Sequence, residues 1–274
     1  MRTSALVVAA LALLAVACGG AEAKATTQLV DVGGYNLSVT CRGEGAGPTV
    51  VIEAGRGNVS GDWQDVEPDV ATFARICSYD RAGLGASDPR PGTATGDDVA
   101  RELHTALAKL NIEPPYVIAT HSIGVLYTRL YAEQFPDDLA GMVFVDGSHE
   151  EQFVPGREDA ATFGDEGLSH IDLTAAVAEL QNARPLGDMP LVVLHGGTAT
   201  DAAWFGYHYK EALLSNNSEL VIANFSGHFI YDEQPGVVTE AIRLVVDAAR
   251  NHAPLSDCKQ SFDGGEAVCV PLTR

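Results

Sequence analysis

Positive charge is scarce in this chain. Its 274 residues include 17 Lys and Arg against 37 Asp and Glu, so the formal net charge at pH 7 is −20. Proteins that bind nucleic acid rely on Lys and Arg contacts to phosphate, and basic residues also drive adsorption to anionic lipid. The charge balance therefore argues against a nucleic-acid partner and against membrane contact through the protein's own charge.

Long apolar runs are also rare, and the one that stands out lies at the start of the chain. Residues 5–17 are apolar and follow Arg2, but the run is shorter than a membrane-spanning helix requires. This pattern predicts a signal peptide over residues 1–17 and export from the cytoplasm. Residues 15–18 resemble a bacterial lipobox, which makes Cys18 a candidate lipid anchor at the start of a tether over 18–27. Cleavage after Ala17 or Ala23 without lipidation is the alternative.

Cysteine spacings typical of metal sites are missing. The chain has no C-x-x-C pair, and we expect neither a metal nor a cofactor. Apart from Cys18, four cysteines remain, an even number that suits disulfides in an oxidising compartment. Cys258 and Cys269 enclose a short segment with little apolar material, so we expect a local disulfide that staples the tail over 251–274. Cys41 and Cys77 are then left to pair, although four cysteines allow three connectivities.

Short apolar runs alternate with segments of helical periodicity. We expect a hairpin followed by single strands, over Leu29–Thr40, Thr49–Glu53, Arg75–Tyr79, Tyr116–Ala119, Gly141–Val145, Leu191–Leu194 and Glu219–Ala223. We expect helices over Asp62–Phe73, Asp97–Leu110, Ile123–Gln134, Leu173–Leu180 and Val237–Arg250. Strands that alternate with helices predict a mostly parallel sheet with helices on both faces. The 45 residues between Val145 and Leu191 exceed a plain crossover, so we expect a lid at about 147–188 within one domain over 28–274.

A serine occupies the turn between a predicted strand and the helix that follows it. The strand leads into Thr120, His121 and Ser122, and Gly124 comes at the start of the helix. This arrangement is typical of the nucleophile elbow, G-x-S-x-G, in which small residues flank a strained turn. Thr120 replaces the first glycine of that motif. An ordinary strand-to-helix turn is the alternative interpretation of the same residues.

Four further segments, together with this turn, resemble the α/β-hydrolase family over nearly the whole chain that follows the signal peptide. They are the glycine loop at 53–57, a Y-D-R-x-G-x-G-x-S-D segment at 79–88, a D-x-S-H-E string at 146–150 and a G-H segment at 226–230. Ala54 stands where the family has the histidine of its oxyanion loop. The resemblance implies an α/β-hydrolase fold with about eight strands, helices on both faces and a lid after the sixth strand. It is closest to the secreted and membrane-anchored hydrolases that carry the D-x-S-H-E string.

A serine hydroxyl is a weak nucleophile until a base removes its proton, and His228 is the expected base for Ser122. It lies in a loop of small residues after the last predicted strand, and the chain order serine, acid, histidine is the order of the family. His195, at the end of a strand, is the rival, whereas His121 is expected to point away from Ser122 and to pack. The other histidines are expected on the surface (His104 and His252) or in lid and loop regions (His149, His170 and His208).

Two aspartates compete for the role of the triad acid. Asp146 stands at the end of a strand, where some members of the family place the acid, and a strand end holds a carboxylate rigidly. Asp201 follows the next strand, but Ala199 occupies the position that the family usually gives to the acid. We favour Asp146. Asp201 is the alternative acid. The structural interpretation of Asp201 is that it caps a helix that begins near Ala202.

An oxyanion hole needs two backbone N–H groups that point at the developing charge. Ile123, the residue after the nucleophile, is expected to supply one, and the family resemblance assigns the other to Arg56. The Arg56 side chain is expected in solvent, with attraction of an anionic substrate as the alternative. Asp80 and Arg81 are expected to form an ion pair beneath these loops.

The expected activity is hydrolysis of carboxylic esters of small or medium size through an acyl-enzyme intermediate. A serine at the elbow excludes the epoxide hydrolases and haloalkane dehalogenases of this fold, which need a carboxylate there. The alternatives are a peptidase of the proline-iminopeptidase type, a cofactor-free perhydrolase, and a binding lipoprotein that has kept the fold. We expect a monomer whose only partner is the small-molecule substrate.

Overall fold

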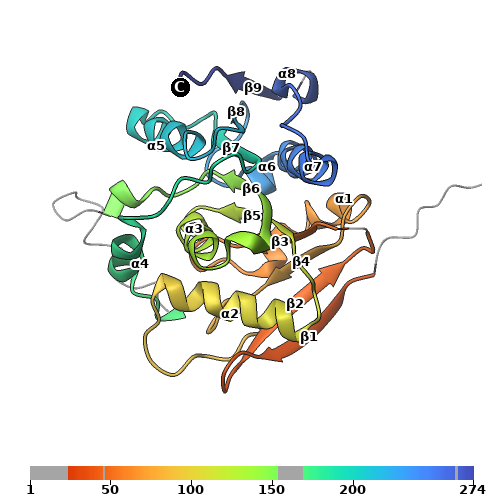
Figure 1. The fold of residues 1–274 in the computed structure, drawn as a ribbon, viewed down its shortest axis with the longest axis vertical. Helices are drawn as coiled ribbons and strands as arrows, with labels where there is room; N and C mark the ends of the chain where they lie inside the picture. The colour runs from red at the N-terminus through yellow and green to blue at the C-terminus, as the bar shows by residue number, and fades with distance from the viewer. Residues whose placement is uncertain (1–23, 46, 154–168, 263–264) are drawn as a thin grey trace, which may run out of the picture.

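A single sheet runs through the part of the chain that the structure, a computed structural model, describes: residues 24–45, 47–153, 169–262 and 265–274. Its strand order is β1-β2-β4-β3-β5-β6-β7-β8-β9 (Figure 1). The strands are β1 (Thr26–Asp31), β2 (Asn36–Arg42), β3 (Thr49–Glu53), β4 (Ile76–Tyr79), β5 (Tyr116–His121), β6 (Leu139–Val145), β7 (Leu191–Gly196), β8 (Ser218–Ala223) and β9 (Ala267–Val270). The central strands pair in parallel, whereas β1, β2 and β9 pair antiparallel at the two edges.

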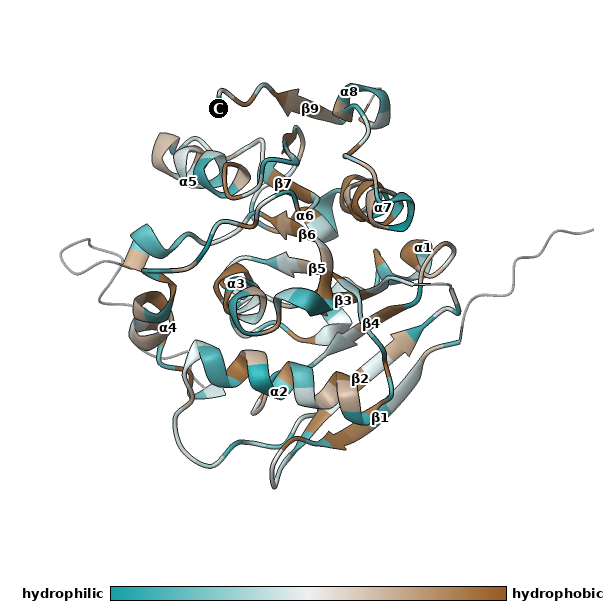
Figure 2. Cartoon of the chain, in the orientation of Figure 1, coloured by the Kyte–Doolittle hydropathy of each residue, from teal (hydrophilic) through white to brown (hydrophobic). Residues whose placement is uncertain are grey.

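Helices cover both faces of this sheet. They are α1 (Glu67–Val70), α2 (Gly96–Lys109), α3 (Gly124–Gln134), α4 (Leu173–Leu180), α5 (Ala202–Ala212), α6 (Ile230–Glu233), α7 (Pro235–Asn251) and α8 (Cys258–Ser261), with 3-10 turns η1 (Ser60–Trp63), η2 (Pro136–Asp138) and η3 (Glu150–Phe153). Alternate side chains of β3 to β8 pack on one face against α1 and α7, and on the other against α2, α3 and α5. Figure 2 shows β6 and β7 in hydrophobic colours and α2 and α7 as mixed surfaces, as expected for buried strands and amphipathic helices.

The fold class predicted from the sequence is confirmed, with two differences in its elements. The sheet has nine strands in the described residues rather than about eight, because the stapled tail contributes β9, which pairs with β8. The helix expected over Asp62–Phe73 is broken into η1 and α1. Pro68 lies in the first turn of α1, a position that starts a helix but cannot continue one.

Both expected disulfides are present. Cys41 and Cys77 face each other in the register of β2 and β4 and are joined, and Cys258 is joined to Cys269. The first bridge closes a loop with a sequence separation of 36 residues, for which chain entropy predicts a stabilisation of about 3–4 kcal/mol. The second ties β9 to α8 at the edge of the sheet.

The segment predicted as a lid is described only at its ends. It begins after β6 with η3, residues 154–168 lie outside the described residues, and α4 follows. Leu173, Ala176 and Val177 of α4 pack with side chains of α2 and α3 in a separate apolar cluster. The predicted signal peptide, Cys18 and most of the tether also lie outside the described residues, so these expectations stay predictions.

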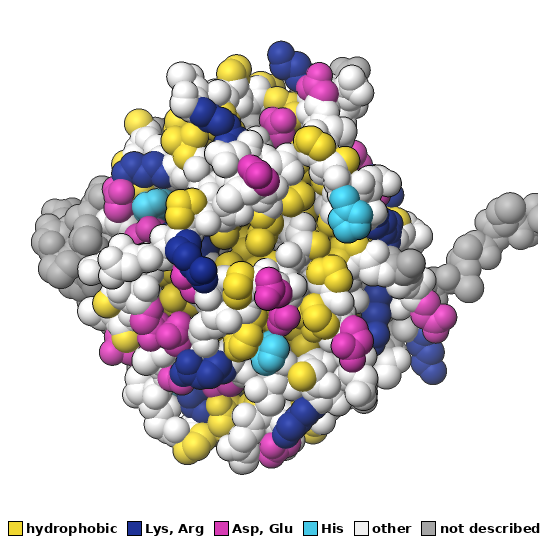
Figure 3. Space-filling model, viewed as in Figure 1, with side chains coloured by type: hydrophobic (Ala, Val, Ile, Leu, Met, Phe, Trp, Pro, Cys, Tyr) yellow, Lys and Arg dark blue, Asp and Glu magenta, His cyan; other side chains and the backbone are white. Residues whose placement is uncertain are grey.

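The charge distribution on one face and the length of the helices bear on possible contacts with a membrane. On the face shown in Figure 3, acidic side chains are scattered among basic ones and do not form one continuous patch. Among the described helices, none combines the length and the apolar character needed to cross a membrane.

Candidate active site

Ser122 lies in a strained turn between β5 and α3. Its φ is +53°, in the left-handed region that a residue with a side chain rarely adopts. The turn needs a glycine two residues later, because a Cβ at Gly124 would lie 2.6 Å from Oγ1 of Thr120 and 2.8 Å from the carbonyl oxygen of Ala54. The backbone is therefore bent and crowded around the serine, as a nucleophile elbow requires. Thr120 fits at the first motif position with its hydroxyl fully buried.

Three side chains that are distant in sequence form one chain of hydrogen bonds. Nε2 of His228 lies 3.0 Å from Oγ of Ser122, and Nδ1 of the same ring lies 2.7 Å from Oδ2 of Asp146. Ser122 follows β5, Asp146 follows β6, and His228 lies between β8 and α6. The parallel strands end at one edge of the sheet, and their carboxyl ends bring the three residues together.

Asp146 is held in a buried, fixed position. It is 1% exposed, its φ is +45°, and its Oδ1 accepts a 2.8 Å hydrogen bond from the N–H of Gly196 at the end of β7. Burial alone raises the pKa of this carboxyl. The hydrogen bonds from His228 and Gly196 and the nearby His208 more than offset that effect and hold the pKa below its usual value. Asp146 is therefore an ionised acceptor at neutral pH.

Asp201, the alternative acid, serves as the N-cap of α5 in the structure. Its Oδ1 accepts a 2.8 Å hydrogen bond from the N–H of Ala203. This capping bond satisfies one of the backbone donors that a helix leaves unpaired at its start. Nδ1 of His228 is engaged with Asp146, so the geometry favours Asp146 over Asp201 as the partner of the histidine.

The loop that carries Arg56 lies directly against the elbow. A Cβ at Gly55 would come within 2.4 Å of Nδ1 of His121, and the carbonyl oxygen of Ala54 touches the start of α3. Ile123 is buried and follows Ser122 at the N-cap position of α3, whereas Arg56 is exposed. The two backbone segments chosen for the oxyanion hole are thus neighbours.

A buried arginine anchors this loop from below. Arg81 is 1% exposed, forms a 2.6 Å ion pair with Glu53, and donates to the carbonyl oxygens of Ala54 and Gly55, each at 2.6 Å. The carboxylate of Asp80, the expected partner of Arg81, instead accepts the backbone N–H groups of Ser60 and Ala86. The acidic partner expected for Arg81 was therefore wrong: Glu53 at the end of β3 forms the ion pair, and the Asp80 carboxylate holds backbone N–H groups of the loops.

His121 points away from the serine and toward the backbone of the loop that carries His228. Its Nε2–H donates to the carbonyl oxygen of His228 at 2.9 Å, and its ring packs on those of His228, Phe229 and Tyr231. Burial and the neighbouring His228 ring lower the pKa of His121 to about 3. His121 is thus a neutral packing residue that also fixes the loop of His228.

His195, the rival base, lies at the other oxygen of Asp146. Its Nδ1 is 3.9 Å from Oδ1 of Asp146 and 2.7 Å from Nδ1 of His208, which is itself 3.8 Å from Oδ1. Nε2 of His208 donates to the carbonyl oxygen of Gly147 at 2.9 Å, so its Nδ1 accepts the proton of His195. Burial lowers the pKa of His208 to about 4 and also lowers that of His195.

Asp146, His195 and His208 also resemble a metal-ligand set. The two ring nitrogens, however, are 2.7 Å apart, whereas two ligands of one tetrahedral zinc ion lie about 3.3 Å apart. Oδ1 of Asp146 is already bonded to a backbone N–H. The distances fit a shared proton between two neutral histidines better than a bound cation.

The remaining histidines are spread over the molecule. His149 is buried and stacks on Tyr207 near η3, and His104 lies partly exposed beside Asp138. His170 lies close to α4 in a left-handed conformation.

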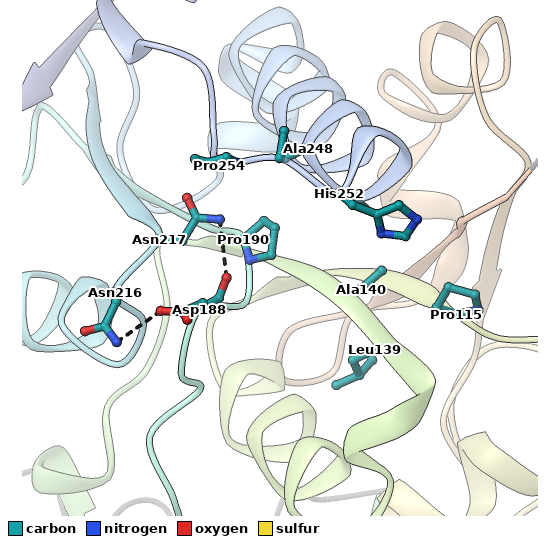
Figure 4. Close-up of a pocket in the computed structure, with 12 residues that line it drawn as sticks. Pro115, Leu139, Ala140, Asp188, Pro190, Asn216, Asn217, Ala248, His252 and Pro254 are labelled. Carbon is teal, nitrogen blue, oxygen red and sulfur yellow. Dashed lines mark hydrogen bonds between the residues drawn. The ribbon is translucent and has the colours of Figure 1, made fainter.

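His252 follows the last residue of α7 and lines a cleft of about 680 Å³ together with Pro115, Leu139, Pro190 and Asn217 (Figure 4). Pro115, Leu139, Pro190 and Asn217 lie at the amino ends of β5 to β8, the opposite edge from Ser122 and Asp146, so this cleft is separate from the candidate site.

Comparisons with known proteins agree with the fold. The family model for the alpha/beta hydrolase fold matches residues 48–172. The chain is 33% identical over 224 residues to the uncharacterized protein YqjL of Bacillus subtilis strain 168, an alignment that covers 77% of this chain and 88% of that one. The chain belongs to the α/β-hydrolase fold family.

Solved structures extend the likeness of this α/β hydrolase to the whole fold. Naproxen esterase from Bacillus subtilis matches with a TM-score of 0.60 and 17% identity, over 81% of this chain and 91% of that one. Haloalkane dehalogenase DbeA from Bradyrhizobium elkani USDA94 matches with a TM-score of 0.66 and 15% identity, over 84% of this chain and 100% of that one. At such identities the likeness shows the fold alone, and the reaction has to be argued from the site.

Sequence reasoning missed the inward face of α5 in this α/β hydrolase. Trp204 bonds to the Asp146 carboxylate at 2.9 Å, His208 forms the pair with His195, and Glu211 lies fully buried beside Gly147. The spacing of four and then three residues places all three on one side of a helix. That spacing is visible in the sequence, but the strand that this side faces is not.

Proposed function

We propose that this α/β hydrolase is a serine hydrolase that cleaves carboxylic esters of small or medium size through an acyl-enzyme intermediate. The observation that carries the proposal is the continuous set of hydrogen bonds from Ser122 through His228 to Asp146, at 3.0 Å and 2.7 Å. The strained elbow exposes the serine to a substrate on one side and to its base on the other. Both distances are within the reach that proton transfer requires.

In the proposed reaction, Nε2 of His228 takes the proton of Ser122 while Oγ attacks the ester carbonyl carbon. The tetrahedral oxyanion is stabilised by the backbone N–H groups of Ile123 and Arg56. Collapse of this intermediate breaks the C–O bond, and His228 gives its proton to the leaving alcohol. Water then repeats the sequence on the acyl-enzyme and releases the carboxylic acid. Throughout, Asp146 keeps the Nδ1–H of His228 in place and stabilises the charged ring.

Two measurements on the purified protein test this proposal. A fluorophosphonate probe should label the protein at Ser122, because an activated serine attacks phosphorus as it attacks a carbonyl. Turnover of p-nitrophenyl esters of increasing chain length should then fall beyond medium acyl chains. Labelling with cleavage of amino-terminal peptide bonds and no esterase activity would point to the peptidase alternative, and absence of labelling would favour a binding protein.

We also propose that the chain is exported, as a lipoprotein anchored at Cys18 or as a secreted protein. The two disulfides support this proposal, because such bonds persist in oxidising compartments. Protein isolated from the cell envelope or the medium should yield the Cys41–Cys77 and Cys258–Cys269 peptides on non-reducing mapping. Recovery of the protein in the cytoplasm with free thiols at Cys41 and Cys77 would contradict it.

A further inference from the structure

The Asp146 carboxylate receives two donors besides His228, its partner in the candidate triad. Oδ1 accepts the N–H of Gly196, and Oδ2 accepts Nδ1–H of His228 at 2.7 Å. Oδ2 also accepts the indole N–H of Trp204 at 2.9 Å. An indole nitrogen can only donate, so the direction of this bond is fixed. Trp204 therefore shares one carboxylate oxygen with the histidine that would act as base.

The local structure holds Trp204 in this place. Asp201 caps the start of α5, so Trp204 lies in the first turn of that helix, three residues after its cap. Its ring meets His228 edge-on at a centroid distance of 5.7 Å and His208 at 5.2 Å. One side of the indole thus packs against the catalytic-histidine ring while its N–H reaches the acid. These contacts hold the indole in place against the His228 ring and the Asp146 carboxylate.

We propose that Trp204 is a positioning residue for the triad acid, which orients Asp146 and shares its negative charge. The proposal rests on the serine hydrolase function proposed above. A hydrogen bond to a charged group is stronger than one between neutral groups. The indole N–H therefore restricts rotation of the carboxylate and draws electron density away from the oxygen that faces His228.

Replacing Trp204 by phenylalanine tests this role, because Phe keeps an aromatic ring but has no N–H. We expect kcat to fall about 10- to 100-fold, which is the scale of losing a group that orients an active-site side chain. KM should stay within about threefold of the wild-type value. Without the indole, Oδ2 carries more negative charge toward His228 and stabilises the protonated ring. The acid limb of kcat/KM should therefore move to higher pH, by about 0.5 to 1 pH unit.

Four other buried titratable groups lie near this cluster. His195 of β7, His208 of α5 and His121 of β5 all have lowered pKa values because they are buried. Burial raises the pKa of Glu211 of α5 well above its usual value. Burial is the main cause of all four shifts, and a phenylalanine at position 204 leaves these groups buried. A displaced acid limb in Trp204→Phe therefore reports the lost indole N–H.

The chain has two tryptophans, and the second is a matched control. Trp63 is fully buried and stacks on Tyr231 at 4.8 Å, and its indole nitrogen has no hydrogen-bond partner among the described residues. Trp63→Phe makes the same chemical change away from Asp146. We expect this variant to lose thermal stability but to keep the wild-type pH profile and kcat.

The contact can also be followed without any turnover. In ¹⁵N-labelled Trp63→Phe protein a single indole N–H resonance remains, that of Trp204. It should exchange slowly with solvent, move with pH over the acid limb, and shift when Asp146 is replaced by asparagine. An indole resonance insensitive to pH and to Asp146→Asn would overturn the proposal, as would a Trp204→Phe profile that superimposes on wild type or moves to lower pH. If the wild-type protein does not hydrolyse esters, the proposed function is overturned instead. The indole resonance then tests only whether Trp204 binds Asp146.

Discussion

Replacing Ser122 by alanine is expected to abolish both ester hydrolysis and labelling by a fluorophosphonate. In the proposed reaction the hydroxyl forms the acyl-enzyme, so without it the remaining site provides only the oxyanion donors and substrate binding. Losses of about 10⁶-fold in kcat are the scale for removing a serine nucleophile. Steady-state kinetics on the best p-nitrophenyl ester, together with mass spectrometry of the labelled protein, would measure both effects.

The same substitution should leave the stability of the fold nearly unchanged. Ser122 keeps its strained backbone in the variant, and alanine removes only the hydroxyl that meets His228. We expect the thermal midpoint to stay within about 4 °C of wild type, which corresponds to about 1 kcal/mol or less for a domain of this size.

Ser148 offers a matched serine for this experiment. It is buried near the elbow, and its backbone N–H donates to the carbonyl oxygen of Ser122 at 2.9 Å, a bond that survives Ser148→Ala. We expect this control to stay within about threefold of wild-type activity, since the triad loses no contact. Turnover of Ser122→Ala within tenfold of wild type, or an equal loss in Ser148→Ala, would contradict the assignment of Ser122 as nucleophile.

The geometry of the candidate triad was largely accessible from the sequence because each of its members follows a strand. A strand end is a local feature, and parallel strands bring their carboxyl ends to one edge whatever the intervening segments do. Ser122 after β5 and Asp146 after β6 are of this kind. The choice between Asp146 and Asp201 was open, because it depended on which loop curves back to His228.

The parts that sequence reasoning missed depend on how distant segments pack. Trp204 reaches Asp146 only because α5 packs beside β7 and β8, next to the residues that follow β6, across 58 residues of chain. The tail contributes β9 because the Cys258–Cys269 bridge brings a four-residue apolar stretch, Ala267–Val270, beside β8. So short a run carries no periodicity that distinguishes a strand from a loop.

The Asp146→Asn substitution is expected to be the most damaging change after Ser122→Ala. Three donors converge on the two carboxylate oxygens: the N–H of Gly196 on Oδ1, and those of Trp204 and His228 on Oδ2. An amide offers one oxygen and an NH₂ group, so in either orientation it turns a donor toward a donor. The arrangement favours the wrong tautomer of His228 and removes the charge that stabilises its protonated ring. We expect kcat to fall by up to about 10⁴-fold.

Asp201→Asn is the matched control for this substitution, because asparagine caps a helix about as well as aspartate does. The variant keeps the acceptor that holds the N–H of Ala203 at the start of α5. Activity should therefore stay within tenfold of wild type, with an unchanged thermal midpoint, whereas Asp146→Asn should also lose about 1–3 kcal/mol of stability through its unsatisfied buried donors. The reverse pattern would make Asp201 the acid, and small losses in both variants would mean that neither carboxylate orients His228. Measuring kcat for the two variants side by side separates these outcomes, because both substitutions replace a carboxylate by an amide and differ only in what the carboxylate holds.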